Sequence, residues 1–393
     1  MNRVWITGIG AVSAAGADVP ALAALLGRGA AAATRDEVLG AAFGVAPDPK
    51  LPREARHLDR AARLFLAAGL EAWRQAGLPA SLPDGDRVAV IEGSSIGAMR
   101  DLLDEYRAHV QRGDRLGPSA LVRYMPGAGG SVLSQLVGAR GAVLHVSAGS
   151  VSATCAIGEA WLKVAGGLAD VALAGGAECP RHPDIVSAFR AAGILAEGPG
   201  QACRPFDAER SGTVLGEGAG ALVLEAEAHA GRRGALPLAV LTGYGLAAEA
   251  YSMTAPEPTG AGVRSAVTQA LAERGAGGLA WIKAHGTGTV LNDLAECRGL
   301  ASALEGRLAE VPMTSLKSAL GHCLGASGAV EAVATVAAMR GGFVPATVGT
   351  RHPDPALPRC RVAMAPEAAR HGEVLLLSES FGGRCAALTV AAA

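Results

Sequence analysis

The chain is poor in aromatic residues, and it has neither an excess of charge of one sign nor a long apolar run. Aromatic residues make up 4% of its 393 residues, and 35 basic side chains balance 36 acidic ones. A formal charge of −1 gives no general attraction to nucleic acid or to an anionic membrane surface. No apolar stretch reaches the roughly 20 residues that a membrane-spanning helix needs. We therefore expect no nucleic-acid partner and no membrane partner.

The cysteines also lack a pattern that would indicate a disulfide framework or a metal site. There are seven of them, an odd number, and none stands in a CxxC motif. The first residues lead directly into Val4–Gly8, which is typical of a buried strand and not of a signal peptide. These features predict reduced thiols and a cytoplasmic protein.

What the chain does have is apolar residues, at 50%, arranged as alternating strand-like and helix-like segments. This alternation predicts an α/β protein with a mainly parallel sheet covered on both faces. The predicted strands are Val4–Gly10, Val88–Glu92, Ala142–Val146, Val171–Gly175, Gly220–Glu225, Leu238–Gly243, Trp281–Ala284 and Val374–Leu377. The predicted helices are Asp59–Ala76, Ile157–Gly166, Val263–Arg274 and Ala329–Met339.

No linker rich in Ser, Gly or Pro divides the chain. The run Arg232–Pro237 is the best candidate boundary, and it predicts an N-terminal half of residues 1–235 and a C-terminal half of residues 236–393. Each half contains a strand that ends in a Gly-rich turn, which suggests a duplication. In the first half this run, Ile6–Ser13, superficially resembles a dinucleotide-binding motif, but Ser13 stands where a third Gly or Ala is expected. We interpret it as a tight strand-to-helix turn.

Two histidines lie beside glycines at the ends of apolar runs. His285 follows Leu279–Ile282, and His322 ends the run Lys317–His322. This setting places an imidazole at a strand or loop end, where it can reach a substrate. The two motifs lack companion ligands at metal-site spacing, so we expect no metal. A lysine in an apolar run needs a partner, and Lys317 is expected to orient His322 or to pair with a buried carboxylate such as Glu296 or Glu331.

These motifs belong to a set of ordered blocks through which nearly the whole chain resembles the β-ketoacyl-acyl carrier protein synthases, close to the elongating ketosynthases of fatty acid and type II polyketide synthesis. The blocks are Trp5–Gly10, Arg204–Asp207 with Gly216–Gly220, Met253–Pro256, His285–Thr289 with Asn292 and Asp293, and Lys317–His322 with Gly325 and Ala326. The resemblance implies a thiolase-like five-layer α/β/α/β/α fold of two related halves. It also implies a substrate presented on the phosphopantetheine arm of an acyl carrier protein, no other cofactor, and a homodimer or a heterodimer with a ketosynthase.

The position of the family's nucleophile differs in this chain. The family has Ser-Thr-Ala-Cys before a helix that runs through Ile-Gly, and counting back from Ile157 and Gly158 places Ser150 at the cysteine and Ser147 at the family serine. Cys155 then falls inside the helix as a packing residue. A serine hydroxyl does not ionise near neutral pH, so it needs a general base, which His285 or His322 can supply.

The glycine-rich loop near the C-terminus differs as well. The family's Gly-Phe-Gly-Gly-Thr-Asn is Ser380–Cys385 here. The resemblance assigns Phe381 to the gate of the acyl pocket and Gly382 to the turn behind it, and the backbone N–H groups of Ser150 and Phe381 to an oxyanion hole. Glu379 stands where a second aromatic residue is common, either as a surface charge or as a group that repels a malonyl carboxylate.

Two threonines complete the candidate site. Thr287 and Thr289 match the family threonines that hydrogen-bond the amides of the phosphopantetheine arm, although the same residues can simply stabilise a turn.

Three functions follow from these residues. The first is acyl transfer through an O-acyl-Ser150 intermediate in a Ser-His-His site, because an oxygen ester condenses poorly with a carbanion yet can pass its acyl group to a hydroxyl, amine or thiol. The second is a chain-length-factor-like partner subunit that does not condense. The third is decarboxylation of a malonyl-carrier protein, which needs both histidines but no nucleophile.

Overall fold

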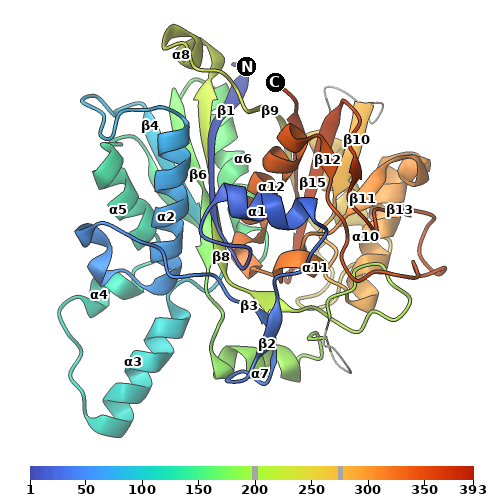
Figure 1. Ribbon diagram of the computed structural model, residues 1–393, viewed down its shortest axis with the longest axis horizontal. Coiled ribbons are helices and arrows are strands. Elements are labelled where there is room, and N and C mark those ends of the chain that lie inside the picture. Colours follow the sequence, from blue (N-terminus) through green and yellow to red (C-terminus); the bar gives the residue numbers. More distant parts are fainter. Residues whose placement is uncertain (197–201, 273–277) are drawn as a thin grey trace.

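All eight predicted strands form strands, and they belong to one 11-stranded sheet in the computed structural model, which describes residues 1–196, 202–272 and 278–393 (Figure 1). In chain order the strands of this sheet are β1 (Val4–Val12), β4 (Val88–Gly93), β5 (Val143–Val146), β6 (Val171–Glu178), β8 (Gly218–Ala226), β9 (Ala239–Ala248), β10 (Leu279–Lys283), β11 (Pro312–Thr314), β13 (Arg361–Val362), β15 (Glu373–Ser380) and β16 (Arg384–Ala391). Two small sheets contain β2 (Thr34–Asp36), β3 (Ala41–Gly44) and β7 (Leu215–Gly216), and β12 (Phe343–Val344) and β14 (Glu367–Ala368).

The described helices include one at each of the four predicted segments. They are α1 (Val19–Gly27), α2 (Arg60–Gln75), α3 (Met99–Arg112), α4 (Ala120–Tyr124), α5 (Ala128–Val137), α6 (Ser152–Ala165), α7 (Pro183–Ala191), α8 (Glu227–Arg232), α9 (Ala261–Ala270), α10 (Val290–Ala303), α11 (Lys317–Leu320) and α12 (Ser327–Gly341). The four at the predicted segments are α2, α6, α9 and α12. The helix predicted over Val263–Arg274 is α9, and its predicted last residue lies outside the described residues. Among the described helices, none has the length and apolar character needed to cross a membrane.

The expectation of a mainly parallel sheet was wrong. The strand order is β13-β11-β10-β15-β16-β9-β1-β8-β6-β4-β5, and pairing is parallel only toward the two edges. The strands from β15 to β6 pair antiparallel in the middle. One reason is local, because β15 turns directly into β16 through a short loop, and a short loop can join only antiparallel neighbours.

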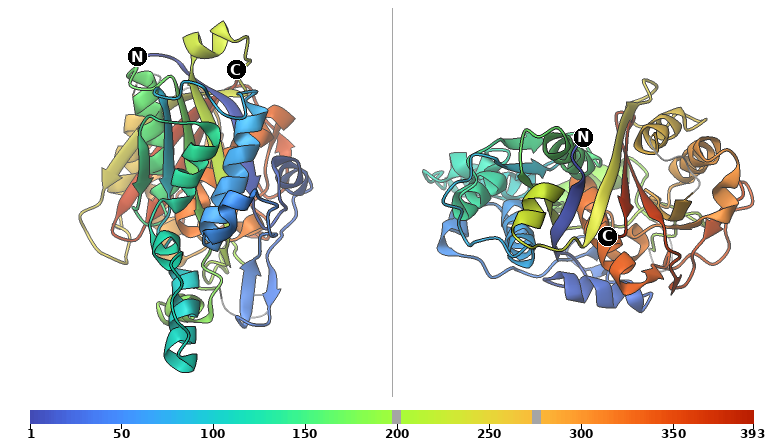
Figure 2. Two further views of the ribbon diagram at one scale, coloured as in Figure 1. Left: turned by 90° about the vertical axis from the view of Figure 1, so that its left-hand side faces the viewer. Right: turned by 90° about the horizontal axis from the view of Figure 1, so that it is seen from above.

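Five layers result because the two halves of the sheet meet only at one end. Strand β1 pairs with β9 over Val4–Ile6 and Ala239–Leu241, and the strands then separate. Helices α6 and α12 fill the space between them and contact both halves. Helices α2 and α5 cover one outer face, and α9 and α10 cover the other (Figures 1 and 2). This is the five-layer α/β/α/β/α arrangement that the resemblance implied; the division at residue 235 stays a prediction.

The glycines of the first strand serve helix packing, so the interpretation of Ile6–Ser13 as a strand-to-helix turn was wrong. The whole run up to Val12 is strand. A β-carbon at Gly8 or Gly10 would lie 2.0 Å from a backbone oxygen of α2, that of Ala72 or Ala68. Only glycine allows α2 to approach the strand this closely.

The same device recurs in the second half. A β-carbon at Gly243 or Gly245 of β9 would lie 2.2 Å or 2.0 Å from the backbone oxygens of Ala270 and Ala266 in α9. The repeated spacing of two glycines against two helical residues four apart supports the prediction of two related halves.

Candidate active site

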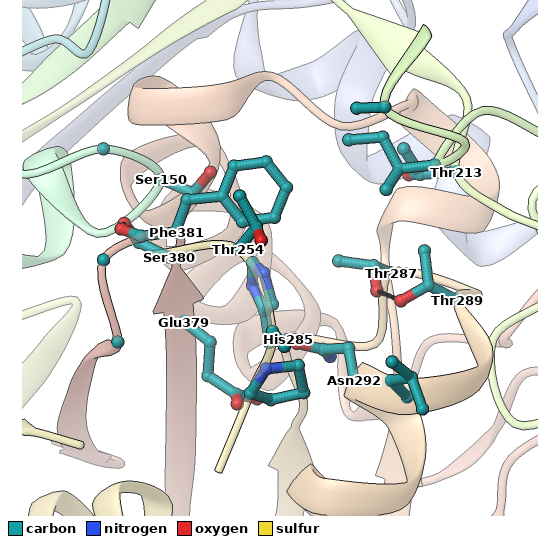
Figure 3. A pocket seen from close by; sticks show the side chains of 18 of the residues that line it. Ser150, Thr213, Thr254, His285, Thr287, Thr289, Asn292, Glu379, Ser380 and Phe381 are labelled. Carbon is teal, nitrogen blue, oxygen red and sulfur yellow. Dashed lines mark hydrogen bonds between the residues drawn. The ribbon is translucent and has the colours of Figure 1, made fainter. Parts of the chain in front are cut away.

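A cavity of about 720 Å³ opens where loops from both halves meet. Its walls come from the turn before α6, the loops after β9 and β10, and the turn between β15 and β16. The structure brings Ser150, His285, Thr287, Thr289, His322, Phe381 and Gly382 together around it. In Figure 3 Ser150 and Phe381 lie on one side of the cavity, and Thr287 and Thr289 lie on the other.

Ser150 stands just before α6, in a tight turn. Gly149 has φ +66°, a conformation that favours glycine. The hydroxyl of Ser152 fixes the turn, since it donates to the Gly149 carbonyl at 2.6 Å and accepts the Ala148 N–H at 2.9 Å. The turn points the Ser150 hydroxyl at His322, and 3.2 Å separates Ser150 Oγ from His322 Nε2.

His322 is held from behind by a residue that the sequence did not indicate. Its Nδ1 lies 2.8 Å from the hydroxyl of Ser327 at the start of α12. When Nδ1 carries the proton and donates to Ser327, Nε2 presents its lone pair to Ser150. Burial, followed by the positive charges of Lys317 and Lys283, lowers the pKa of His322 well below its usual value. The imidazole is therefore neutral and able to accept a proton.

His285 lies edge-on to His322, with ring centroids 5.5 Å apart and an interplanar angle of 84°. Its backbone N–H and that of Gly286 both donate to the carboxylate of Glu296, which anchors the loop after β10. The Nδ1 atom of His285 is buried and has no hydrogen-bond partner among the described residues. Burial, together with Lys317 and His322, lowers the pKa of His285 as well.

Lys317 lies behind the histidines and does not line the cavity. Its Nζ donates to Glu331 Oε1 at 2.7 Å, while Lys283 donates to the other oxygen of the same carboxylate. The prediction of a buried carboxylate partner is confirmed, with Glu331 in that place and Glu296 bound elsewhere. The two buried lysines share one carboxylate, and, after burial, their charges are a further cause of the lowered pKa of both histidines. Lys317 thus acts on the histidines through its electric charge, from outside the cavity.

The remaining predicted residues form the wall and entrance of the cavity. The hydroxyls of Thr287 and Thr289 lie 2.8 Å apart, so each has a local partner while facing the cavity. Phe381 is 49% exposed at the entrance. Gly382 has φ +82° and donates its N–H to the Met253 carbonyl at 2.8 Å, which ties the β15–β16 turn to the loop after β9.

The burial of two side chains decides between the interpretations given for Cys155 and for Glu379. Cys155 is buried inside α6, as expected, and burial raises the pKa of its thiol, which leaves it unreactive. Glu379 is not a surface charge, because only 4% of it is exposed. Burial, and then the nearby carboxylates of Glu296 and Glu249, raise the pKa of Glu379 well above its usual value.

Glu178, at the end of β6, was not predicted, and it shapes another wall of the cavity. Its carboxylate accepts the hydroxyl of Ser94 at 2.8 Å and three successive backbone N–H groups of Ser95, Ile96 and Gly97. It also accepts the N–H of Gly325 at 3.1 Å, beside the loop that carries His322. A single buried carboxylate therefore joins the loop after β4 to the loop before α12.

The five-layer fold of two related halves places this chain in the thiolase-like class. The family models described as "Beta-ketoacyl synthase, N-terminal domain" and "Beta-ketoacyl synthase, C-terminal domain" match residues 1–230 and 238–351. The chain belongs to the β-ketoacyl synthase family.

Curated relatives and solved structures match most or all of the chain. The chain is 35% identical over 394 residues to "Nodulation protein E" of Rhizobium sp. (strain N33), which covers 97% of this chain and 96% of that protein. It is 35% identical over 343 residues to "3-oxoacyl-[acyl-carrier-protein] synthase 2" of Vibrio cholerae, covering 84% and 81%. Among solved structures, "The ishigamide ketosynthase/chain length factor" superposes with a TM-score of 0.90 at 30% identity, covering 100% of this chain and 99% of that one.

Proposed function

We propose that the protein is an acyltransferase that moves an acyl group from the phosphopantetheine thioester of an acyl carrier protein to Ser150 and from there to an acceptor. The observation that carries the proposal is the distance of 3.2 Å between Ser150 Oγ and the Nε2 atom of a neutral, buried His322. A serine in this position has the base that its chemistry requires.

The first half of the reaction forms the ester. His322 Nε2 takes the proton of the Ser150 hydroxyl while Oγ attacks the thioester carbonyl carbon. In this proposal the backbone N–H groups of Ser150 and Phe381 stabilise the negative charge on the carbonyl oxygen. The carbon–sulfur bond then breaks, and the imidazolium returns the proton to the departing thiolate. Thr287 and Thr289, which line the cavity, bind the amides of the arm in this proposal.

The second half transfers the acyl group to a hydroxyl, amine or thiol. The acceptor loses its proton to His322 as it attacks the ester carbonyl, and Ser150 Oγ leaves with that proton. His285, whose Nδ1 has no hydrogen-bond partner in the part of the chain that the structure describes, is the second imidazole available to hydrogen-bond a substrate carbonyl. Carbon–carbon condensation is disfavoured, since an oxygen ester is less electrophilic than a thioester.

The test is intact mass spectrometry after incubation with acyl carrier protein thioesters of several chain lengths. The expected result is a mass increase equal to one acyl group, absent in Ser150→Ala. Absence of any adduct at every chain length would contradict the proposal. Ser150→Cys should show more condensation than the native serine, because it restores the thioester intermediate.

The same variant separates the two alternatives. Release of carbon dioxide from a malonyl-carrier protein that persists in Ser150→Ala indicates decarboxylation, and unchanged pathway output in Ser150→Ala indicates a chain-length-factor-like subunit.

We also propose that the protein forms a dimer, with itself or with a ketosynthase. Strand β5 is an edge of the large sheet, and its Val143 and Leu144 are 38% and 45% exposed. An apolar, unpaired edge favours pairing with another chain. Helix α3 projects from the body on the same half (Figure 1) and buries none of its residues, although it carries Leu102, Tyr106 and Val110.

A further inference from the structure

A second polar cluster lines the cavity. Glu379 of β15 pairs in register with Cys385 of β16, so their side chains share one face of the sheet. Glu249, which directly follows β9, completes the cluster. One ligand atom of each of the three residues lies within 4.8 Å of the others, and all three residues line the cavity.

One oxygen of this cluster has no hydrogen-bond partner. The thiol of Cys385 donates weakly to Glu249 Oε1 at 3.9 Å, and Glu249 Oε2 accepts the backbone N–H of Glu257 at 3.1 Å. Glu379 Oε1, in contrast, is buried and unpartnered among the described residues, on a side chain that is 4% exposed. A buried oxygen without a donor is costly, and this one belongs to a residue that lines the cavity (Figure 3).

Within the described part of the chain, the hydrogen bonds of two basic side chains, Arg384 and Lys317, go to other groups and not to this cluster. Arg384 also lines the cavity, and its guanidinium donates to the Phe381 carbonyl at 3.4 Å. Lys317 is bound to Glu331. Burial is the largest cause that raises the pKa of both Glu379 and Glu249. The cluster thus holds one carboxyl group, that of Glu379, with an oxygen that lacks a donor among the described residues. Beside it lies the carboxyl group of Glu249, whose oxygens accept the Glu257 N–H and the Cys385 thiol.

We infer that Glu379, with Glu249 beside it, is a subsite for the ammonium group of an acyl chain or acyl acceptor that ends in a primary amine. The inference rests on the proposed function for the substrate that occupies the cavity. An ammonium group donates to Glu379 Oε1 and balances one carboxylate charge. An alkyl end of the same length leaves that oxygen unpartnered and gains nothing from the second carboxyl group.

A metal ion fits the cluster less well. Coordination by all three residues needs the Cys385 thiolate as well as both carboxylates, and burial, followed by the charges of Glu379 and Glu249, raises the pKa of that thiol. A divalent ion with three anionic ligands would also leave a net negative charge in a buried place, whereas an ammonium on one carboxylate is neutral overall.

Proton release gives the subsite a distinctive signature. Burial, and then the carboxylates of Glu296, Glu249 and Asp293, raise the pKa of Glu379, and an arriving ammonium favours its ionised carboxylate. Binding therefore releases up to one proton at neutral pH. The preference for an amine over an alkyl end should grow as the pH rises, because less work is then needed to ionise Glu379, until the amine itself loses its charge.

The test uses pantetheine amides, which cannot transfer their acyl group. Amides with ω-amino acyl chains of increasing length are compared by calorimetry with alkyl amides of equal length, in buffers of different ionisation enthalpy. At one chain length the amine is expected to bind at least about tenfold more tightly at pH 8, with proton release. Glu379→Gln should abolish the preference and the proton release while alkyl amides bind as before. Glu227→Gln, at an exposed carboxylate outside the cavity, is the control and should change neither.

Equal binding of amine and alkyl amides at every length would overturn the inference, as would a preference that survives in Glu379→Gln. Stoichiometric binding of Zn²⁺ that is lost in Glu379→Gln would assign the cluster to a metal and also overturn it. Because amides do not acylate Ser150, the result is independent of the proposed chemistry. Ser150→Ala should retain the amine preference even if no acyl-enzyme ever forms.

Discussion

Ser150 Oγ and His322 Nε2 lie 3.2 Å apart although 172 residues separate them in the chain. The pair bridges the two halves of the fold, because the serine precedes α6 and the histidine precedes α12, the two helices of the middle layer. A third residue, Ser327, orients the histidine from its other nitrogen. The hydroxyl of Ser150, the imidazole of His322 and the hydroxyl of Ser327 therefore form a chain of two hydrogen-bond contacts.

Removing either imidazole should show whether the site is catalytic or belongs to a non-catalytic partner subunit. His285→Ala and His322→Ala are each expected to lower the rate of acyl transfer at least about a hundredfold, the usual scale for losing a general base or a transition-state donor. The unfolding midpoint should change much less, since both rings face the cavity. His57→Ala, at an exposed ring, is the control. Unchanged pathway flux in both cavity variants would refute the catalytic role.

Removal of the Ser327 hydroxyl should disturb His322 without touching the substrate. Ser327→Ala is expected to slow acylation of Ser150 by roughly tenfold or more, about 1.4 kcal/mol of barrier, because His322 loses the partner that selects its tautomer. The pH dependence of acylation should shift at the same time.

Ser134→Ala removes another buried hydroxyl, which donates to the Ser131 carbonyl in α5, and it should leave rate and pH profile unchanged. If both variants lose activity equally, the effect is general destabilisation and Ser327 has no positioning role.

The carboxylate of Glu331 should be essential for stability. Glu331→Gln leaves the ammonium groups of Lys283 and Lys317 buried without a counter-charge, which is expected to cost about 3–5 kcal/mol of unfolding free energy. Denaturant titration measures this directly. Glu227→Gln breaks the exposed pair with Arg3 and should cost less than about 1 kcal/mol. Similar small losses in the two variants would show that the lysines are neutral or solvated.

Glu92 should make the protein less stable as the pH rises. Burial, opposed in part by the N–H of Gly130, raises the pKa of Glu92 from 4.5 to about 8. Between these values the folded state holds a proton that the unfolded state has lost, so this residue's contribution to stability falls by up to about 1.4 kcal/mol per pH unit as the pH rises.

Glu92→Gln keeps a neutral, isosteric side chain and removes this contribution. Its unfolding free energy relative to the native protein should therefore increase from pH 5 to pH 8 in parallel denaturant titrations. A difference that stays constant over that range would show that Glu92 is not protonated in the folded state.

The edge strand β5 should control assembly. Leu144→Lys places a charge on an exposed apolar edge, and it is expected to convert dimers into monomers in sedimentation velocity with an unchanged circular dichroism spectrum. Leu168→Lys changes a residue that is 73% exposed elsewhere and should leave the assembly intact. If the native protein is already monomeric at micromolar concentration, the proposed dimer through β5 is wrong.

Much of the fold could be predicted because its signals are local. Apolar runs predicted eight strands of the large sheet, and Ile157 and Gly158 set the register that predicts Ser150 at the nucleophile position. Strand direction was mispredicted because it depends on how β15, β16 and β9 return across the sheet. The glycines of β1 were misread because their reason, a close approach of α2, involves residues some 60 positions away.

The sequence by itself determined the family, the half that carries each motif, and the residue types available for chemistry, since these depend on order and spacing. Only the tertiary structure decided which of those residues meet. It brought His322 to Ser150, placed Ser327 behind the ring, and buried Glu379 in a cavity wall instead of at the surface. Burial and distance set the protonation state of a side chain, and both arise only when segments far apart in the chain pack together.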